Sequence, residues 1–199
     1  MTTMEMLLST SPIVVYDTEF TSWPGANERN WNGPGEHREI VQIGAVLLDA
    51  KREEVGVFSQ LVCPKINPVL SDYFIALTGI TNNDLAAHGQ SLLDALQQFA
   101  QFCSEAAFAC AFGIDHKIIQ ENCDLIGIVN PLTSIKFVDV RQCLCDLAKI
   151  NPSKVYSAKL PAVFGLQPQA HAHDGLSDAR AIASVLCHLR AKYPQQVTL

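Results

Sequence analysis

The segment IVVYDTEF at residues 13–20 restricts the fold more than any other part of this chain, because a β-branched apolar run leads directly into acidic residues. The apolar run predicts a buried strand over residues 12–19. Asp17 and Glu19 are two positions apart, so both side chains leave an extended strand on the same face. Charges at the end of a buried strand need compensation, and a divalent cation between the two carboxylates would supply it. Mg²⁺ or Mn²⁺ is the expected ion, since these hard cations prefer carboxylate oxygen.

Further apolar segments predict a sheet of several strands. A second and a third strand are expected at residues 39–49 and 55–63, and the charged turn between them indicates an antiparallel hairpin. A short buried strand is expected at 106–112 and a further strand at 135–138.

Helices are expected between these strands. The clearest is at residues 91–103, where leucine, phenylalanine and alanine form one apolar face. The others are expected at 70–77, 115–125, 139–149, 157–164 and 175–192. This alternation predicts an α/β fold in which one mixed β-sheet is flanked by helices. Because neither a repeat nor a linker interrupts the pattern, residues 1–199 are expected to form a single domain.

Composition is typical of a compact protein, with 48% hydrophobic and 17% charged residues. No apolar stretch reaches the roughly 18 to 20 residues that a membrane span requires. The first apolar residues are not preceded by a basic segment. We therefore expect a soluble, cytoplasmic protein without a membrane partner.

The seven cysteines are an odd number without disulfide-framework spacing, so reduced thiols are expected. Five of them are expected in the core: Cys63, Cys103, Cys110, Cys123 and Cys187. Cys143 and Cys145 form a C-x-C pair on an expected helix, where positions i and i+2 point apart, and no second pair completes a zinc site. A structural zinc site is therefore the less favoured interpretation.

The net charge of −6 argues against tight, nonspecific binding along a nucleic acid, which depends on lysine and arginine. Part of that charge belongs to the proposed site itself, where bound cations would reverse the local sign. An acidic chain is compatible with a short nucleic-acid end held by metal ions.

Asp115 follows a predicted buried strand and opens a predicted helix. Aspartate at such a junction is often only a helix cap, and for Asp115 taken alone that interpretation is favoured. The same junction is where open α/β sheets place groups that bind ligands.

His173 and Asp178 occur in the segment HDGLSD and are five positions apart. Taken alone, Asp178 could be a first-turn acid favoured by the helix dipole, and His173 a surface residue. His171 and Asp174 lack the same spacing to Asp178 and are expected at the surface or at the margin of the site.

The order of these residues resembles the DEDDh 3′-to-5′ exonuclease superfamily, which has a ribonuclease H-like fold and includes ribonuclease T and the epsilon subunit of DNA polymerase III. The matching pattern is D-x-E, a mid-chain Asp that opens a helix, and then H-x-x-x-x-D. The segment EIVQIGAVLLD resembles the second strand of that superfamily. The motifs LTGIT and H-x-G-L-x-D resemble the branch that contains the histone-mRNA and small-RNA 3′ exonucleases.

The resemblance implies a role for each matching residue. Four would bind two Mg²⁺ or Mn²⁺ ions: Asp17, Glu19, Asp115 and Asp178. His173 would be the general base, with Glu19 also catalytic. The terminal nucleotide would be contacted by Glu19, Phe20, Leu77, Thr78, Ile80 and His173.

Two features depart from the superfamily pattern. The pair that often includes tryptophan before the third acid is absent, and Gly113 precedes Asp115 by two positions instead. The long polar loop from Trp23 to Arg38 has no assigned equivalent. Loops of that length are often functional.

The expected function is hydrolysis of phosphodiester bonds at the 3′ end of RNA or single-stranded nucleic acid, releasing nucleoside 5′-monophosphates. Two cations about 3.5–4 Å apart would stabilise the attacking and leaving oxygens. The alternatives are a non-catalytic module of the same fold that binds RNA ends, and an exonuclease specific for DNA or for short oligonucleotides. A metal-dependent phosphatase of another fold is disfavoured because its usual nucleophile and histidine cage are not evident. Sequence alone leaves open the choice between RNA and DNA and the oligomeric state.

Overall fold

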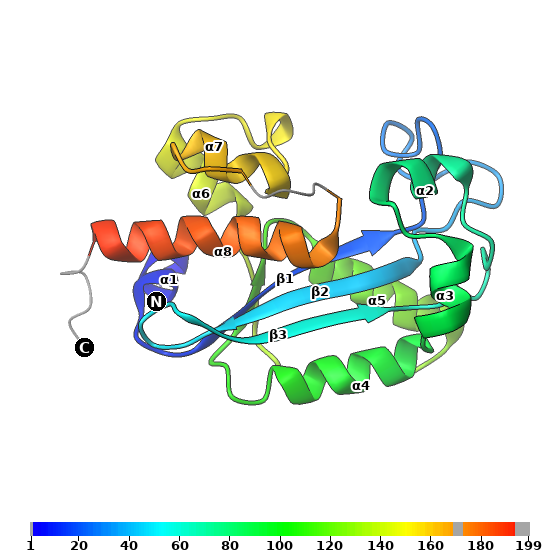
Figure 1. The fold of residues 1–199 in the computed structure, drawn as a ribbon, viewed down its shortest axis with the longest axis horizontal. Helices are drawn as coiled ribbons and strands as arrows, with labels where there is room; N and C mark the ends of the chain where they lie inside the picture. The colour runs from blue at the N-terminus through cyan, green and yellow to red at the C-terminus, as the bar shows by residue number, and fades with distance from the viewer. Residues whose placement is uncertain (1, 169–172, 194–199) are drawn as a thin grey trace.

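A five-stranded mixed sheet forms the centre of the computed structural model, which describes residues 2–168 and 173–193 (Figure 1). The strands are β1 (Ile13–Phe20), β2 (Ile40–Leu48), β3 (Glu54–Leu61), β4 (Ala109–Ala111) and β5 (Phe137–Asp139). Their order is β3-β2-β1-β4-β5. The β1–β2 and β2–β3 pairs are antiparallel, while β1–β4 and β4–β5 are parallel. The predicted mixed sheet and the β2–β3 hairpin are confirmed.

Helices cover both faces of the sheet, with α8 on one side and α4 and α5 on the other (Figure 1). The helices are α1 (Thr3–Leu8), α2 (Asp72–Thr78), α3 (Asn82–His88), α4 (Leu92–Phe102), α5 (Asp115–Ile126), α6 (Arg141–Ala148), α7 (Leu160–Val163) and α8 (Gly175–Lys192). Two short 3₁₀ turns, Pro152–Lys154 and Ser157–Lys159, precede α7. Within the described part of the chain, we find no helix with the length and apolar character needed to cross a bilayer.

Strand β1 is buried on both faces, which explains its continuous apolar sequence. Ile13 and Val15 belong to the core cluster that contains α8 residues, whereas Val14 and Tyr16 belong to the cluster that contains α4 and α5 residues. Side chains alternate between faces along a strand, so the Asp17 side chain lies on the same face as those of Ile13 and Val15. The strand therefore presents its acidic end on the same face as α8.

Two helices were not predicted from the sequence, α1 and α3. Both are short and begin with a capping box, in which Thr2 pairs with Glu5 and Thr81 pairs with Asp84. The pattern of threonine followed three residues later by an acid was the available signal. Their apolar periodicity spans too few residues to stand out.

Some predicted elements differ in extent. The strand expected at 106–112 is reduced to the three residues of β4, and the helix expected at 157–164 divides into a 3₁₀ turn and α7. All seven cysteines are free. The core prediction is wrong for Cys63, which is exposed because β3 ends at Leu61.

The start of α8 lies directly on β2, backbone against backbone. A Cβ atom at Gly44 would overlap the backbone of Gly175 and Leu176, so only glycine fits there. The side chain of Gln42 joins the same two elements: its Oε1 accepts the Gly175 N–H at 2.8 Å and its Nε2 donates to Asp174 at 2.8 Å. These contacts fix the beginning of α8 beside the acidic end of β1.

Candidate active site

A cleft of about 440 Å³ lies where β1 ends, next to the starts of α5 and α8. Six residues predicted as site residues line it: Asp17, Glu19, Phe20, Asp115, His173 and Asp178. Asp17 is half-buried, whereas Glu19 and Asp115 are each 8% exposed and Asp178 is 3% exposed. Residues up to 161 positions apart in the chain (17 and 178) therefore meet in one cavity, as the superfamily resemblance predicts.

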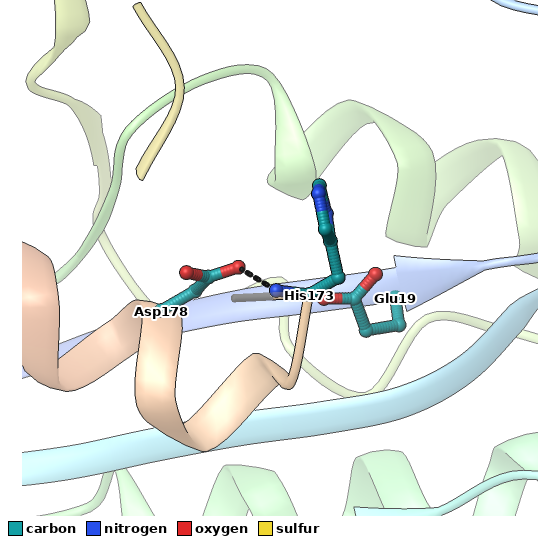
Figure 2. Close-up of side chains that lie close together, drawn as sticks. All are labelled: Glu19, His173 and Asp178. Carbon is teal, nitrogen blue, oxygen red and sulfur yellow. Dashed lines mark hydrogen bonds between the residues drawn. The ribbon is translucent and has the colours of Figure 1, made fainter. Parts of the chain in front are cut away.

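Glu19, His173 and Asp178 form a compact group in which one ligand atom from each lies within 4.8 Å of the others. Figure 2 shows their origins: Glu19 comes from β1, His173 from the segment before α8, and Asp178 from the first turn of α8. The backbone N–H of His173 donates to Oδ2 of Asp178 at 3.2 Å. His173 has a φ of +61°, in the left-handed region that non-glycine residues seldom adopt. This turn brings the histidine back over the helix that carries Asp178.

Asp115 does not act as a side-chain helix cap. It is the first residue of α5, and the N-cap position belongs to Ile114, which makes no side-chain cap bond. The Asp115 carboxylate instead faces β1, where its Oδ1 accepts the Thr18 hydroxyl at 2.7 Å and the Thr18 N–H at 3.2 Å. The cap interpretation is therefore wrong, and Asp115 is held against the residue between the two acids of β1.

Burial and neighbouring negative charges raise the pKa of the carboxyl groups in this cleft. Burial raises the pKa of Glu19 to about 8, and the neighbouring charges of Asp178 and Asp115 add to the effect. Burial likewise raises the pKa of Asp178 to about 7. The pKa of Asp17 is well above its ordinary value, first through burial and then through the charges of Asp115 and Glu19. A cluster of this kind is stabilised in its charged form by bound cations.

One further observation fits a metal ion. Oδ1 of Asp178 is buried and has no hydrogen-bond partner within the described residues. Buried carboxylate oxygens are otherwise almost always paired. Carboxylate oxygens are the ligands that Mg²⁺ and Mn²⁺ prefer, so Asp17, Glu19, Asp115 and Asp178 are a suitable set to hold such ions.

His173 is suited to accept a proton. Burial lowers its pKa, which favours the neutral imidazole near pH 7. Its ring stacks on Tyr156, with 5.7 Å between ring centroids and 22° between ring planes. Asp174 is the N-cap of α8 and accepts the Ser177 N–H, so its role is structural. His171, which was expected at the margin of the site, lies outside the described residues.

The structure does not bring Leu77, Thr78 and Ile80 into this cleft. Leu77 and Thr78 lie at the end of α2, and Ile80 packs with a separate apolar cluster that includes Phe74. The hydroxyl of Thr78 donates to the Phe74 carbonyl at 3.0 Å. Contact between these residues and a terminal nucleotide stays a prediction.

Several cleft residues were not identified from the sequence. The loop between β1 and β2 contributes Asn27, Asn30, Trp31 and Arg38, and more distant segments contribute Asp139, Arg141, Tyr156 and Ser157. The length and polarity of the loop were the available signal. The others stand in unremarkable sequence patterns.

Comparison with known proteins agrees with this geometry. The family model described as Exonuclease (RNase_T) matches residues 14–186. The chain belongs to this exonuclease family. The match runs from β1 through most of α8 and so includes every acid of the cleft. The superfamily resemblance seen in the sequence is thereby confirmed.

Two curated exonucleases are similar to this exonuclease-family chain. The 3′-5′ exonuclease Snipper of Drosophila melanogaster is 25% identical over an alignment of 201 positions, gaps included, which covers 90% of this chain and 69% of Snipper. The 3′-5′ exoribonuclease 1 of Homo sapiens is 25% identical over 183 residues, which cover 87% of this chain and 50% of the human protein. The chain thus spans only half the length of the human relative.

The fold is also that of a solved nuclease. The nuclease domain of 3′hExo, a DEDDh family member whose structure was solved bound to rAMP, superposes with a TM-score of 0.77. The two are 23% identical, and the alignment covers 92% of each chain. The predicted ribonuclease H-like sheet flanked by helices is therefore confirmed.

Proposed function

We propose that this chain is a metal-dependent exonuclease that removes nucleotides from the 3′ end of single-stranded RNA and releases nucleoside 5′-monophosphates. The observation that carries the proposal is the convergence of Asp17, Glu19, Asp115, His173 and Asp178 in one cleft of an exonuclease-family chain. The names of the relatives support the 3′-to-5′ direction, and the human relative is named an exoribonuclease. We extend both properties to this chain.

The four acids are proposed to hold two Mg²⁺ or Mn²⁺ ions. Such ions lower the pKa of water and stabilise negative charge at phosphorus when they are bound. Thr18 orients one of the ligands, because its hydroxyl and N–H both donate to the same oxygen of Asp115. The raised pKa values of Glu19 and Asp178 imply that ion binding displaces protons from the cleft.

His173 is proposed as the general base. As the water oxygen attacks phosphorus in line, a ring nitrogen of His173 takes the water proton, and the bond from phosphorus to the 3′ oxygen of the preceding nucleotide breaks. That oxygen leaves with a proton from solvent, which restores a free 3′ hydroxyl on the shortened chain. Stacking on Tyr156 fixes the plane of the imidazole.

The cleft also contains cationic groups that suit an anionic substrate. Arg141 lies beside Asp115, and its Nε donates to the Phe112 carbonyl at 3.2 Å. Arg38 also lines the cleft, and its guanidinium pairs with Glu121 at 2.6 Å. Two arginines at the cleft, in a chain of net charge −6, favour a short nucleic-acid end over extended contact with a long backbone.

Digestion of matched RNA and DNA oligomers tests this proposal. Each oligomer is labelled at its 5′ end or its 3′ end and incubated with Mg²⁺, Mn²⁺ or chelator. We expect immediate release of the 3′ label as a nucleoside monophosphate and a descending ladder from the 5′ label, with RNA cleaved faster than DNA. Loss of the 5′ label first would contradict the direction, and equal rates on both sugars would contradict the substrate class.

Chelation tests whether the metal ions are needed for catalysis or for folding. EDTA should stop hydrolysis while the circular dichroism spectrum stays unchanged, because the two core clusters consist of apolar residues. Mg²⁺ or Mn²⁺ should restore activity, whereas Ca²⁺ should bind without supporting turnover. Unfolding on chelation would indicate a structural metal instead.

A further inference from the structure

A second hollow, separate from the cleft, lies between the 3₁₀ turns and α7 and has a volume of about 760 Å³. Apolar side chains dominate its lining, among them Ile150, Val155 and Val163. The exposed side chains of Lys154 and Lys159 also line it, and none of the described lining residues is acidic. We call this hollow the lysine groove. A mostly apolar lining with a few polar groups, in a pocket of this size, is typical of binding sites.

The lysine groove and the cleft share one segment of the chain. Within residues 154–159, Tyr156 and Ser157 line the cleft, whereas the other four residues line the groove. The ring of Tyr156 contacts both sides, because it stacks on His173 and has the Lys159 ammonium 4.9 Å from its centroid. Tyr156 is 40% exposed. A nucleic acid that leaves the cleft past His173 therefore meets the lysines of the groove.

The segment that forms the groove is basic, although the protein is acidic. Residues 141–168 contain four lysines or arginines and one acid, in a chain of net charge −6. The lysines of this segment form no ion pair with any described residue. Their charges are therefore available to an anionic ligand.

The groove is built on a rigid support. Val155 and Leu160 are buried in the core cluster that contains α8 residues, and α7 packs against α8 (Figure 1). Each of the two lysines is next in sequence to one of these buried residues. The backbone that carries the lysines is thus held in place relative to the helix that carries Asp178.

We infer that the lysine groove binds single-stranded RNA upstream of the cleft, with an unpaired base on its apolar residues and the adjacent phosphates at Lys154 and Lys159. This inference rests on the proposed function, because it follows the same substrate beyond the cleft. Unpaired bases pack on apolar and aromatic side chains, and the lysine ammonium binds phosphate as a point charge. An acidic peptide would satisfy the same charges, but the contact with the cleft through Tyr156 favours RNA.

The first test varies the length and the ionic strength. Oligomers with the same 3′ end and increasing length, starting from the dinucleotide, are compared in the parent and in the double variant Lys154→Gln, Lys159→Gln. The ratio of kcat/KM between long and short oligomers should fall in the variant. The salt dependence of affinity for a long oligomer should lose about 0.7 in log–log slope for each lysine, or about 1.4 in total. An unchanged slope, or an equal loss of activity at all lengths, would overturn the inference.

A second double variant, Lys149→Asn with Lys192→Gln, provides the matched control. Both lysines are exposed and neither lines the groove, so the same charge is removed elsewhere. Asparagine is chosen at position 149 because it tolerates the positive φ of +55° there. The control should keep the parental slope and the parental length ratio. A slope as low as that of the groove variant would show that general attraction, and not the groove, controls binding.

The apolar part of the groove is tested by filling it. Ala162 is exposed and lines the groove, so Ala162→Phe adds bulk there without changing the charge or the core. It should lower the length ratio, whereas Ala162→Ser should keep it. Thermal unfolding at the parental temperature verifies that both variants are folded. A parental length ratio in folded Ala162→Phe would exclude a base from the groove.

A binding measurement separates this inference from the proposed catalysis. With Ca²⁺ in place of Mg²⁺, the fluorescence anisotropy of a 5′-labelled oligomer reports binding without turnover. Weaker binding by the Lys154→Gln, Lys159→Gln variant, in a protein that hydrolyses no oligomer, would refute the proposed function and leave the groove standing. Equal RNA affinity of parent and variant would refute the groove as an RNA site. If a glutamate- and leucine-containing peptide then bound the parent alone, the groove would belong to an acidic protein partner.

Discussion

The two walls of the cleft are built in different ways. On the sheet side, acidic groups are buried and are positioned by the backbone of β1 and by the first turns of α5 and α8. On the loop side, Asn27 and Asn30 are exposed, and the chain that carries them is held by side-chain hydrogen bonds and one ion pair. The first wall places acidic groups where water is scarce, which strengthens their attraction for cations. The second presents the half-buried Trp31 ring and exposed amides to the cleft.

If the acidic groups of the sheet side carry out the hydrolysis, substitutions there will affect every substrate equally. The predictions below concern the sheet wall and run from the largest expected effect to the smallest.

Neutralising any one acid should reduce hydrolysis to background. The variants are Asp17→Asn, Glu19→Gln, Asp115→Asn and Asp178→Asn. Each should melt at the parental temperature or above it, because removing one carboxyl relieves the repulsion that raises the pKa values of its neighbours. Release of a 3′-labelled nucleotide and thermal unfolding measure the two effects. Asp124→Asn, an exposed acid on the same helix as Asp115, is the control and should be fully active.

Near-normal turnover in one of the four variants would remove that residue from the metal site. Unfolding of Asp115→Asn would revive a structural role for that residue.

Replacing His173 should lower kcat by about 10²–10⁴-fold, the usual contribution of a general base, with little change in metal or substrate affinity. The rate of the parent should rise with pH through a midpoint below about 6.5, because burial lowers the pKa of His173. That limb should vanish in His173→Ala. Rates of single turnover over a series of pH values measure both effects.

His188→Ala, on α8 but outside the cleft, serves as the control. From the sequence we also expect His171→Ala to be close to neutral. Equal activity of His173→Ala and His188→Ala would exclude His173 from proton transfer.

The metal-free protein should become less stable as pH rises. Folding raises the pKa of Glu19 from 4.5 to about 8 and that of Asp178 from 3.8 to about 7. At any pH between the unfolded and the folded pKa of either group, the folded state therefore binds more protons than the unfolded state. The free energy of unfolding therefore falls as pH increases through this window. Thermal unfolding in EDTA at a series of pH values measures the trend.

Saturating Mg²⁺ should flatten the pH dependence of stability, and Glu19→Gln should weaken it. A metal-free melting temperature that rises over the same range would contradict the clustered-acid description.

The smallest effect is expected at Thr18. Thr18→Val keeps the shape of the side chain but removes the hydroxyl that donates to Asp115. A hydrogen bond to a charged group contributes about 1.5–3 kcal/mol. The Thr18 N–H still donates to the same Asp115 oxygen in the variant, so the effect of losing the hydroxyl should be smaller than this. We expect a several-fold weaker apparent affinity for Mg²⁺ in activity titrations. Thr18→Ser, which keeps the hydroxyl, should match the parent, and a weakened Thr18→Ser would point to packing instead.

The sequence predicted the sheet wall well, for physical reasons. A buried β-branched strand that ends in D-x-E has few structural explanations, and the spacing of His173 and Asp178 restricts them further. The partner of Asp115 was not predictable, since the hydrogen bond to Thr18 joins positions 97 apart, and local pattern alone favoured a helix cap.

The loop wall escaped prediction because its conformation depends on contacts between distant residues. Nothing local to Trp31 indicates a positive φ, which is set by packing on Phe20 and by the bond to the Thr21 carbonyl. The polar loop was expected to be functional, but its residues could not be assigned to the cleft. Leu77, Thr78 and Ile80 were assigned to the terminal nucleotide by resemblance; they do not line this cleft, and their contact with a nucleotide stays a prediction.

The close contact at Gly44 limits how this enzyme can move. Gly44 pairs with Asp17 across β1 and β2, and its other neighbour is the backbone of Gly175 and Leu176 at the start of α8. Without intervening side chains to slide or rotate, the strand that carries Asp17 and the helix that carries Asp178 must shift as one rigid body. Asp17 and Asp178 are thereby kept at a fixed separation from one turnover to the next. After each cleavage, it is the shortened nucleic acid that must travel forward by one nucleotide into a site that stays assembled.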